Sequence, residues 1–587
     1  MECEYPSAFP YRELVADDIR LLKVRPGELG SPIECQLFQI ALTPDIKYYA
    51  LSYVWGDPNV TKPILINGQP LQVTTNLYSA LDQLRASIPE FTEQFVWVDA
   101  ICIDQSDDTG DKERQIPRMA DIFRQASRVL GWLGPIDPSE DKAIEAIFSK
   151  AVSMQQDLVA FEPEAGISDI AVLHRLRDRW HWESSQQADL QSYLQSFDPS
   201  LRALLERPWF QRRWIVQEVC APEQSPDMCV GRHIVDLDTL YTLSRIAESI
   251  SIQVLLCFGE LRRLKKARDE YRLLTRHGSR ENIQFSQILL ELLTEASWTK
   301  ATNEHDYIYC FLGLCNLKGD KKLDGVLRPD YQKPYEQVYY NVVAKIISET
   351  GDLRLLNDGR SRLKDMPYWV PDFRLPIGQH FKPFADARSV ALLAEGRILS
   401  VKGRLLGVVE VIMSGDTPPD IGDEMKDWFD RRIKKVEDML ARASYFQVVN
   451  IDVLRQNWLK LCFGWKLPGI TPAERLYEDL RKQSLADLMA HADGVGLLRA
   501  ILSQGYAAIS GGLLAPMIPG TVAREGDIVG IFLGGGLLYV IRPSGMGYEI
   551  VSVCDRCDGF KIDQLRSEEF WKQQGLERQE LETFLLV

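Results

Sequence analysis

A cluster of carboxylates follows a short apolar run in the first quarter of the chain. The run covers residues 95–98 and is β-branched or aromatic, which is typical of a short buried strand. Polar groups just past the carboxyl end of a strand line the crevice in which an open α/β sheet binds ligands. A carboxylate there can accept a proton, hold a ribose hydroxyl or stabilise positive charge in a transition state. The candidates for such catalytic roles are Asp99, Asp104, Asp111 and Glu113.

The acidic stretch also has a structural interpretation. Asp107 and Asp108 would only solvate a loop, and Asp111 would favour the N-terminus of a helix through the helix dipole. For Asp99 and Asp104 the catalytic and the structural interpretations have equal weight.

Four aromatic side chains occur near the ends of the apolar strands around this cluster. Core packing is the default role for such residues. Gathered at one edge of a sheet, they would also suit a pocket for an apolar ligand. The candidates for substrate binding are Tyr53, Trp55, Trp97 and Trp132.

Other reactive residue types give weaker signals. All seven histidines lie at position 174 or beyond, so a Ser-His or Cys-His nucleophile built within residues 46–135 alone is excluded, although a distant histidine could fold in. Cys102 lies at an apolar strand end without a neighbouring base and is interpreted as a buried, inert thiol. The pair Cys554-x-x-Cys557 supplies only two of the four ligands that zinc needs. We therefore expect no metal and no cofactor.

Composition limits the class of protein. A chain of 587 residues predicts two to four domains, and a net charge of −15 argues against nucleic acid as a partner. The first twenty residues are too acidic for a signal peptide, and no apolar run is long enough to span a membrane. Eleven scattered cysteines suggest reduced thiols, so we expect a cytoplasmic protein of undetermined oligomeric state.

The elements that would position the cluster can be predicted from periodicity. Strands are expected at residues 19–24, 33–38, 49–54, 95–98 and 128–133, and Asn67-Gly68 predicts a hairpin over residues 64–73. Asn76 could cap a helix whose Leu77, Ala80, Leu81 and Leu84 share one face. A second helical stripe runs from Ile116 to Ala126, and a third from Phe210 to Val219. The alternation of strands and helices predicts an α/β sheet.

Several blocks in this order resemble the fungal heterokaryon-incompatibility (HET) domain. They are Tyr49-Ala-Leu-Ser-Tyr-Val-Trp-Gly56, Asn76-Leu-x-x-Ala-Leu-x-x-Leu-Arg85, Trp97-Val-Asp-Ala-Ile-Cys-Ile-Asp-Gln105, Gln115-Ile-x-x-Met119, Gly131-Trp-Leu-Gly134 and Arg207-Pro-Trp-Phe-Gln-Arg-Arg-Trp-Ile-Val-Gln-Glu-Val219. The resemblance implies a TIR-like α/β core sheet with helices, followed by a mainly helical region and a small β-rich C-terminal region. The expected divisions are lead-in strands over 1–45, the HET domain over 46–220 with a helical insert at 136–200, helices over 221–395, and a mixed region over 396–587 that includes a β-meander.

The resemblance implies an intracellular effector of non-self recognition that triggers cell death in a filamentous fungus. Some TIR relatives hydrolyse NAD with a catalytic glutamate, but the loop that would carry it departs from the family pattern at Asp104 and at Asp111-Lys112, so we expect no strong NAD hydrolase here. The alternative is a HET-like scaffold that acts as a cofactor-independent pericyclase, catalysing a Diels–Alder cyclisation in terpenoid biosynthesis. Such an enzyme needs a shaped apolar pocket. The expected partner is accordingly a small apolar substrate or another protein.

Overall fold

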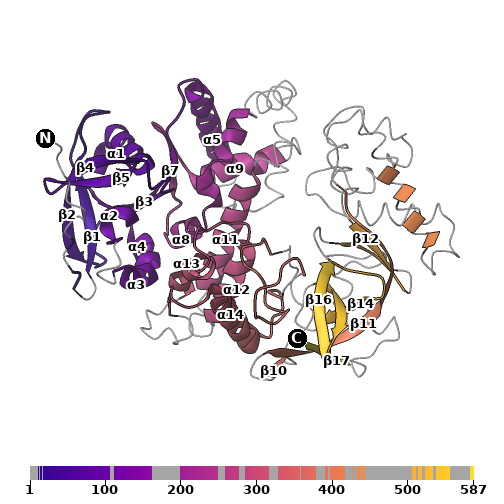
Figure 1. The fold of residues 1–587 in the computed structure, drawn as a ribbon. Coiled ribbons are helices and arrows are strands. Elements are labelled where there is room, and N and C mark those ends of the chain that lie inside the picture. The colour runs from indigo at the N-terminus through magenta and orange to yellow at the C-terminus, as the bar shows by residue number, and fades with distance from the viewer. Residues whose placement is uncertain are drawn as a thin grey trace, which may run out of the picture. The chain divides into compact units, whose positions relative to one another are not determined.

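The computed structural model describes most of the chain. The described residues are 11, 13–15, 18–105, 111–161, 199–248, 258–276, 285–315, 328–356, 359–377, 390–393, 397–416, scattered positions between 428 and 442, 505–510, 513–517, 522–532, 537–554 and 582–587. They divide into two compact units, Met1–Tyr331 and Gln332–Val587 (Figure 1). Each unit has its own sheet, and each is described by itself.

The first unit is built on a nine-stranded mixed sheet. The strands run in the order β5-β4-β2-β1-β6-β3-β7-β8-β9. Their bounds are β1 (Asp18–Val24), β2 (Glu34–Ala41), β3 (Tyr48–Tyr53), β4 (Thr61–Ile66), β5 (Gln69–Thr74), β6 (Phe95–Trp97), β7 (Arg128–Gly134), β8 (Asp227–Val230) and β9 (His233–Asp236). The predicted strands and the hairpin are confirmed, and Asn67 and Gly68 at the hairpin turn have φ of 53° and 81°.

Four neighbouring strands of this sheet are parallel. Strand β3 pairs in parallel with β6 on one side and with β7 on the other, and β7 pairs in parallel with β8. In chain order the four parallel strands are β3, β6, β7 and β8. In the sheet they lie in the order β6-β3-β7-β8, that is, second, first, third, fourth. This is the flavodoxin-like doubly wound order. The predicted α/β class is confirmed.

Helices cover both faces of the parallel strands. Helix α1 (Thr75–Ser87) packs its apolar stripe into the same core as Leu51, Tyr53 and Trp132. Helix α4 (Met119–Gln125) covers the opposite face, where the Tyr48 hydroxyl donates to the carbonyl of Ile122 at 2.6 Å. Alternate residues of β3 therefore serve two different cores.

The cap of α1 differs from the prediction. The Thr74 hydroxyl accepts the backbone N–H of Leu77, so Thr74 and not Asn76 is the N-cap. The Asn76 amide instead donates to the Val54 carbonyl at 2.6 Å and accepts from the Trp132 indole at 3.1 Å. Asn76 thus joins the ends of β3 and β7.

We expect Asn76→Ala to lower the free energy of unfolding by about 2 kcal/mol, because it leaves a buried indole N–H and a carbonyl without partners. Urea unfolding of the variant would measure this. Thr74→Ala, which removes only a long capping bond, should cost about 1 kcal/mol or less. A larger loss for Thr74→Ala than for Asn76→Ala would contradict this assignment.

Two predicted helical stripes are interrupted. Pro117 lies in a 3-10 turn, Ile116–Arg118, so α4 begins only at Met119. The prediction of one continuous helix from Phe210 to Val219 is wrong. The segment consists of the 3-10 turn η3 (Pro208–Gln211) and the short helix α8 (Ile215–Cys220). An extended residue, Arg212, separates them and pairs with Lys300.

The longer helices that the structure describes elsewhere in the first unit are α5 (Asp141–Phe161), α9 (Leu237–Glu248), α11 (Gly259–Arg276), α12 (Phe285–Glu295) and α13 (Asp306–Cys315). Helix α5 lies in the predicted insert, whose residues 162–198 fall outside the described ranges. Strands β8 and β9 extend the sheet within the region expected to be mainly helical.

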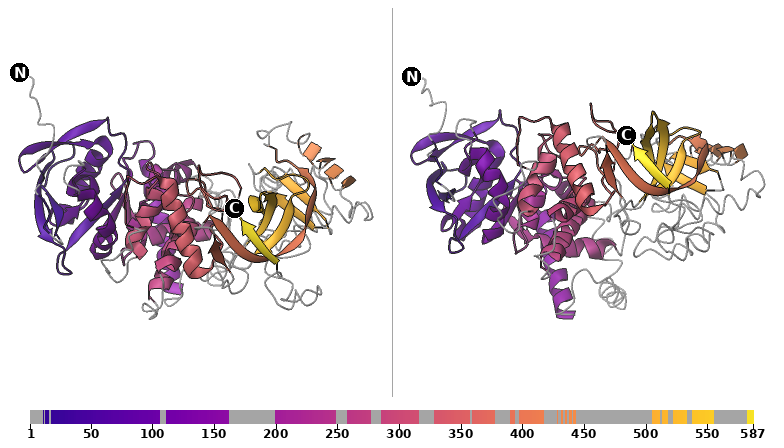
Figure 2. Two further views of the ribbon diagram at one scale, coloured as in Figure 1. Left: turned by 60° about the horizontal axis from the view of Figure 1, so that its bottom comes forward. Right: turned by 90° about the horizontal axis from the view of Figure 1, so that it is seen from below.

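The second unit contains helix α14 (Tyr335–Thr350) and a sheet whose strands are mostly antiparallel. Its strands are β10 (Ala391–Leu393), β11 (Ile398–Met413), β12 (Gly505–Ile509), β13 (Leu513–Met517), β14 (Ile528–Phe532), β15 (Leu538–Ser544), β16 (Gly547–Cys554) and β17 (Glu582–Leu586). The predicted meander is confirmed as β14, β15 and β16. Figure 2 shows β11 as a long curved strand, and its register shifts at Leu405/Gly407 and Val409/Val411 supply bulges that favour such bending.

Candidate functional site

A ligand site is expected at the carboxyl ends of the parallel strands. In a doubly wound sheet, ligands bind where the strand order reverses, which is beside the first strand. Here the order reverses between β3 and β7, so that position is at the carboxyl end of β3 on the side of β7. The chain continues from β3 into Val54, Trp55 and Gly56, and from β6 into the short helix α2 (Asp99–Cys102).

Asp99, which follows the neighbouring strand β6, is the predicted carboxylate that contacts the chain leaving β3 at this point. Its side chain is largely buried, and its Oδ2 accepts the Trp55 indole N–H at 2.8 Å. The same oxygen lies 3.5 Å from the guanidinium of Arg212. Its Oδ1 accepts the backbone N–H of Ala100 at 2.7 Å. Asp99 therefore connects β3, α2 and the segment that precedes α8.

Asp111 has a different neighbourhood. It begins helix α3 (Asp111–Gln115), but its Oδ2 is held by Arg20 at 2.7 Å and by the backbone N–H of Asp104 at 2.9 Å. Arg20 also donates to the carbonyl of Cys102 at 2.9 Å. Arg20 thus connects both ends of the acidic loop to strand β1. The Asp111 carboxylate therefore anchors this loop, in addition to the interaction with the helix dipole that the sequence suggested.

Fewer contacts can be given for the other acidic candidates. Asp104 is buried, with 4% of its surface exposed. Glu113 lies in α3, but its side chain falls outside what the structure describes, as do Asp107 and Asp108. Asp104 and Asp111 are thus adjacent through a backbone contact, whereas Asp99 makes its contacts with Trp55, Ala100 and Arg212 in a separate cluster.

The four aromatic candidates do not gather around one pocket. Tyr53 and Trp132 are buried in the core under α1, whereas Trp97 packs edge-on against Phe123 of α4 on the opposite face, at 5.4 Å between ring centroids. Trp55 is 38% exposed. Only Tyr53 and Trp55 adjoin Asp99, and the separation follows from the alternation of side chains along strands.

Sequence reasoning missed the residues that complete the cluster. Arg212 donates to Glu218 at 2.8 Å and to the Tyr53 carbonyl at 3.0 Å. Glu218 also accepts the Ser52 hydroxyl, and that hydroxyl accepts the Trp209 indole N–H at 2.8 Å. We call Ser52, Asp99, Arg212 and Glu218 the switch-point cluster. The one sequence signal was the presence of charged residues, Arg212 and Glu218 among them, in a segment otherwise assigned to packing.

Burial controls the electrostatics of the cluster. Desolvation raises the pKa of Glu218 above its ordinary value, and the charge of Arg212 offsets this only partly. Burial alone would lower the pKa of Arg212, but the charges of Glu218 and Asp99 outweigh it and the net pKa is raised. The cluster therefore holds a fixed cation between carboxylates in a place of low dielectric.

We expect Glu218→Gln to change how stability depends on pH. A raised folded-state pKa means that the folded protein binds this proton more tightly than the unfolded chain. The cost of the buried charge is then absent below the ordinary glutamate pKa of about 4.3 and grows as pH rises toward the folded-state pKa, by about 1.4 kcal/mol for each pH unit between the two. The variant's unfolding free energy should thus fall less than the wild type's over that window, as measured by urea unfolding.

The exposed Glu90 offers the matched control for this measurement, because Glu90→Gln removes a carboxylate that lies on the surface. That variant should keep the wild-type slope. Identical slopes for wild type and Glu218→Gln would contradict the electrostatic assignment.

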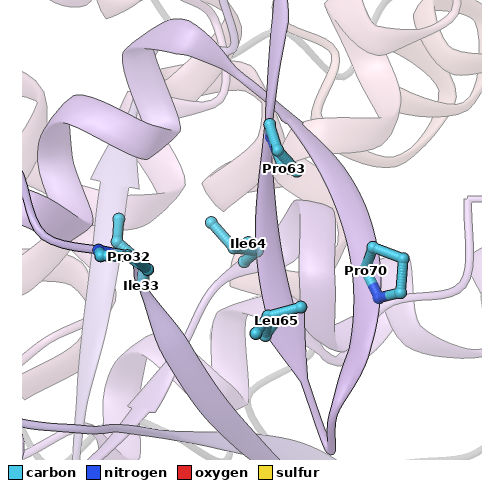
Figure 3. A pocket seen from close by; sticks show the side chains of 6 residues that line it. All are labelled: Pro32, Ile33, Pro63, Ile64, Leu65 and Pro70. Atoms are coloured by element: carbon cyan, nitrogen blue, oxygen red, sulfur yellow. The ribbon is translucent and has the colours of Figure 1, made fainter.

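A separate cavity lies at the edge of the sheet. It has a volume of about 330 Å³ and is lined by apolar side chains of β4, β5 and the segment entering β2 (Figure 3), namely Pro32, Ile33, Pro63, Ile64, Leu65 and Pro70. It contains none of the aromatic or acidic candidates. The size would admit a small apolar ligand, but the lining offers no polar side chain to orient one.

Among the residues that the structure describes, the thiols and the acidic groups offer little covalent or metal chemistry. Cys102 is buried, as expected, and burial raises the pKa of its thiol to about 12. Within the described ranges, no three His, Cys, Asp or Glu side chains are grouped as a metal would require. Cys557 lies outside those ranges, whereas Cys554 is buried in β16. The helices that the structure describes are all too short or too polar to cross a membrane.

Comparison with known proteins places this geometry in a family context. Residues 48–218 match the family model described as "Heterokaryon incompatibility protein (HET)". The chain is also similar to "Heterokaryon incompatibility protein 6, OR allele" of Neurospora crassa, with 25% identity in an alignment 446 residues long that covers 66% of this chain. The match spans 62% of that relative's own length. No solved structure matches the chain. Both partners of the contact between Ser52 and Glu218 fall within the matched residues.

Proposed function

Because this chain carries a heterokaryon-incompatibility (HET) domain over residues 48–218, we propose that it is an effector of incompatibility that triggers cell death in a filamentous fungus. The family match is the observation that carries the proposal, and the similarity to the Neurospora crassa protein supports it. We place the effector's centre at the switch-point cluster. It lies where doubly wound sheets bind ligands, and it joins β3 at the start of the matched region to α8 at its end.

The effector acts in the cytoplasm under this proposal. Six described cysteines are buried and form no disulfide with one another, which suits a reducing compartment, namely Cys35, Cys102, Cys220, Cys229, Cys310 and Cys315. Its partner is a small molecule or another protein that binds at Trp55. This side chain is partly exposed and is bonded to Asp99.

Regulated expression in a fungal host tests the proposal. Induction of the full chain should stop growth and admit a membrane-impermeant dye, and Arg212→Ala should abolish both at an equal protein level. Arg232→Ala is the matched control, because Arg232 is an exposed arginine that pairs with Asp141 on the surface. This variant should kill as the wild type does.

The outcomes separate two parts of the proposal. Continued growth after induction of the wild type at high protein level would overturn the effector role. Killing by Arg212→Ala at wild-type potency would be consistent with the effector role but would show that the switch-point cluster is not the functional centre of the effector. Thermal unfolding of both variants shows whether a loss of killing is a loss of the fold.

The cyclase alternative stays a prediction. It would need an aromatic pocket with a polarising donor. The cavity at β4 and β5 has neither, so no observation leads us to advance a cyclisation here.

A further inference from the structure

The switch-point cluster and its surroundings carry more negative than positive charge. Arg212 lies between Asp99 and Glu218, and a third carboxylate, Asp306 of α13, also acts on its pKa. Asp306 accepts hydrogen bonds from Trp214 at 3.1 Å and from Tyr331 at 2.8 Å, both neutral groups. Among the described residues, two carboxylates therefore pair with this guanidinium and a third, Asp306, acts on it from farther away, with His305 also acting on Asp306.

The neutral hydrogen bonds do not fully compensate this charge. Burial raises the pKa of Asp306, as it does that of Glu218, although each accepts hydrogen bonds. A carboxylate whose pKa is raised in this way would gain from another nearby cation, because an opposite charge favours its ionised form. The electrostatics thus favour a positively charged ligand over an anion.

A buried hydroxyl beside the cluster provides a second, independent observation. Tyr53 is 1% exposed, and its hydroxyl oxygen has no hydrogen-bond partner among the described residues. Asp99 approaches this hydroxyl closely: after burial, its charge and its side-chain contact raise the pKa of the phenol further above the usual range, although the two groups do not form a well-aligned hydrogen bond. A buried hydroxyl without a partner costs about 1–3 kcal/mol, which a polar atom placed beside it would recover.

Trp55 connects Asp99 with the solvent. Its indole N–H is bonded to Asp99 while the side chain is 38% exposed. Gly56, which follows, has a φ of 81°, a conformation that favours glycine. An indole in this place can leave its bond to Asp99 and present its ring face to a cation.

We propose that the switch-point cluster binds the alkylammonium group of a small organic cation, with Asp99 and the Tyr53 hydroxyl as acceptors and Trp55 as the ring that covers it. The inference rests on the proposed placement of the effector's centre in this cluster. It names the chemistry of the ligand: a primary or substituted amine that is protonated at neutral pH. An anionic or purely apolar ligand of equal size does not satisfy these groups.

Titration of the full chain with n-butylammonium chloride tests the proposal. The readout is the indole N–H resonance of Trp55 in ¹⁵N-tryptophan-labelled protein, assigned by its loss in Trp55→Phe. We expect a saturable shift with n-butylammonium and none with 1-butanol, a neutral probe of the same size. Asp99→Asn should weaken binding at least tenfold, and Asp121→Asn, which removes a carboxylate paired with Arg124 on α4, should not.

Tyr53→Phe keeps the test valid if Asp99→Asn does not fold. It deletes a hydroxyl that has no partner, so the fold should be retained, and binding of n-butylammonium should weaken several-fold. Equal shifts with 1-butanol, no saturable shift at all, or unchanged affinity in both variants would each overturn the proposal. Cation binding together with continued growth in the expression assay would overturn the effector role alone, and killing without cation binding would overturn only the ligand assignment.

Discussion

A chain that ends after Cys220 is expected not to fold cooperatively, whereas a chain that ends after Tyr331 is expected to fold. The family match ends at residue 218, within α8, and every residue of α8 is buried. The elements that bury α8 come later in the sequence. Gln217 fits between the carbonyl of Cys310 and the backbone N–H of Ala120, which links α8 to α13 and α4. The matched region is therefore an incomplete core.

The contacts at the end of α8 show why the loss is large. Arg268 of α11 donates to the carbonyls of Val219 and Glu223 and so supplies a cation at the C-terminus of the helix. Re-exposing each large apolar side chain of α8 costs about 1.5–3 kcal/mol, and the sum is comparable with the roughly 5–15 kcal/mol that holds an ordinary domain together. Strands β8 and β9 would be lost as well.

Urea unfolding followed by far-UV circular dichroism checks this prediction. Residues 1–331 should give a sigmoidal transition, as a unit that clusters separately from Gln332–Val587 would. Residues 1–220 should give a soluble aggregate or a broad, non-cooperative transition. A sharp transition for residues 1–220 would show that the matched region is self-sufficient, contrary to the packing of α8.

Local patterns explain how much of the fold the sequence could predict. The strands and the hairpin follow from apolar runs and from Asn67-Gly68, which act over a few residues. Asn76 is a reasonable prediction for the cap of α1 because asparagine is a good cap, but a threonine two positions earlier is equally able. The choice is decided by the end of β7, where Trp132 uses the Asn76 amide. That partner is 56 residues away and leaves no local signal.

The candidate site shows the same limit more clearly. Asp99 can be found because it follows a strand, and its place at the end of β6 is as expected. Arg20, which holds Asp111, lies 91 residues before it. Ser52, which donates to Glu218, lies 166 residues before that glutamate. Such pairs can be recognised only once the topology places β1 beside the acidic loop and α8 beside β3.

The separation of the aromatic candidates depends on register. Trp97 is opposite Ala50 and Trp132 is opposite Tyr53 in the parallel pairs, which puts Trp97 and Tyr53 on different faces. A shift of one residue in the pairing of β3 with β6 would have reversed this. Strand periodicity alone cannot supply the register. The sequence therefore could not show that the aromatic side chains lie on two different faces and not around one pocket. The TIR-like description of the core stays a prediction beyond the α/β class.

Replacing Arg213 is expected to have the largest effect of any single substitution described above. Arg213 is fully buried, and its guanidinium donates to the carbonyl of Ala296 at 2.5 Å, the hydroxyl of Thr299 at 3.0 Å and the carbonyl of Tyr307 at 2.9 Å. It also lies 4.6 Å from the centre of the Phe311 ring. One side chain thus joins the segment before α8 to the end of α12 and to α13.

Arg213→Ala should lower the free energy of unfolding by about 3–5 kcal/mol, because it leaves a large cavity and removes donors from buried acceptors. Arg213→Met separates the two causes, since methionine refills the volume but donates no hydrogen bond. We expect it to recover only part of the loss in urea unfolding. Full recovery would assign the effect to packing, because burying a guanidinium is itself costly. A loss below about 1 kcal/mol for Arg213→Ala, similar to that of the exposed Arg232→Ala, would contradict the linking role of Arg213 between α8, α12 and α13.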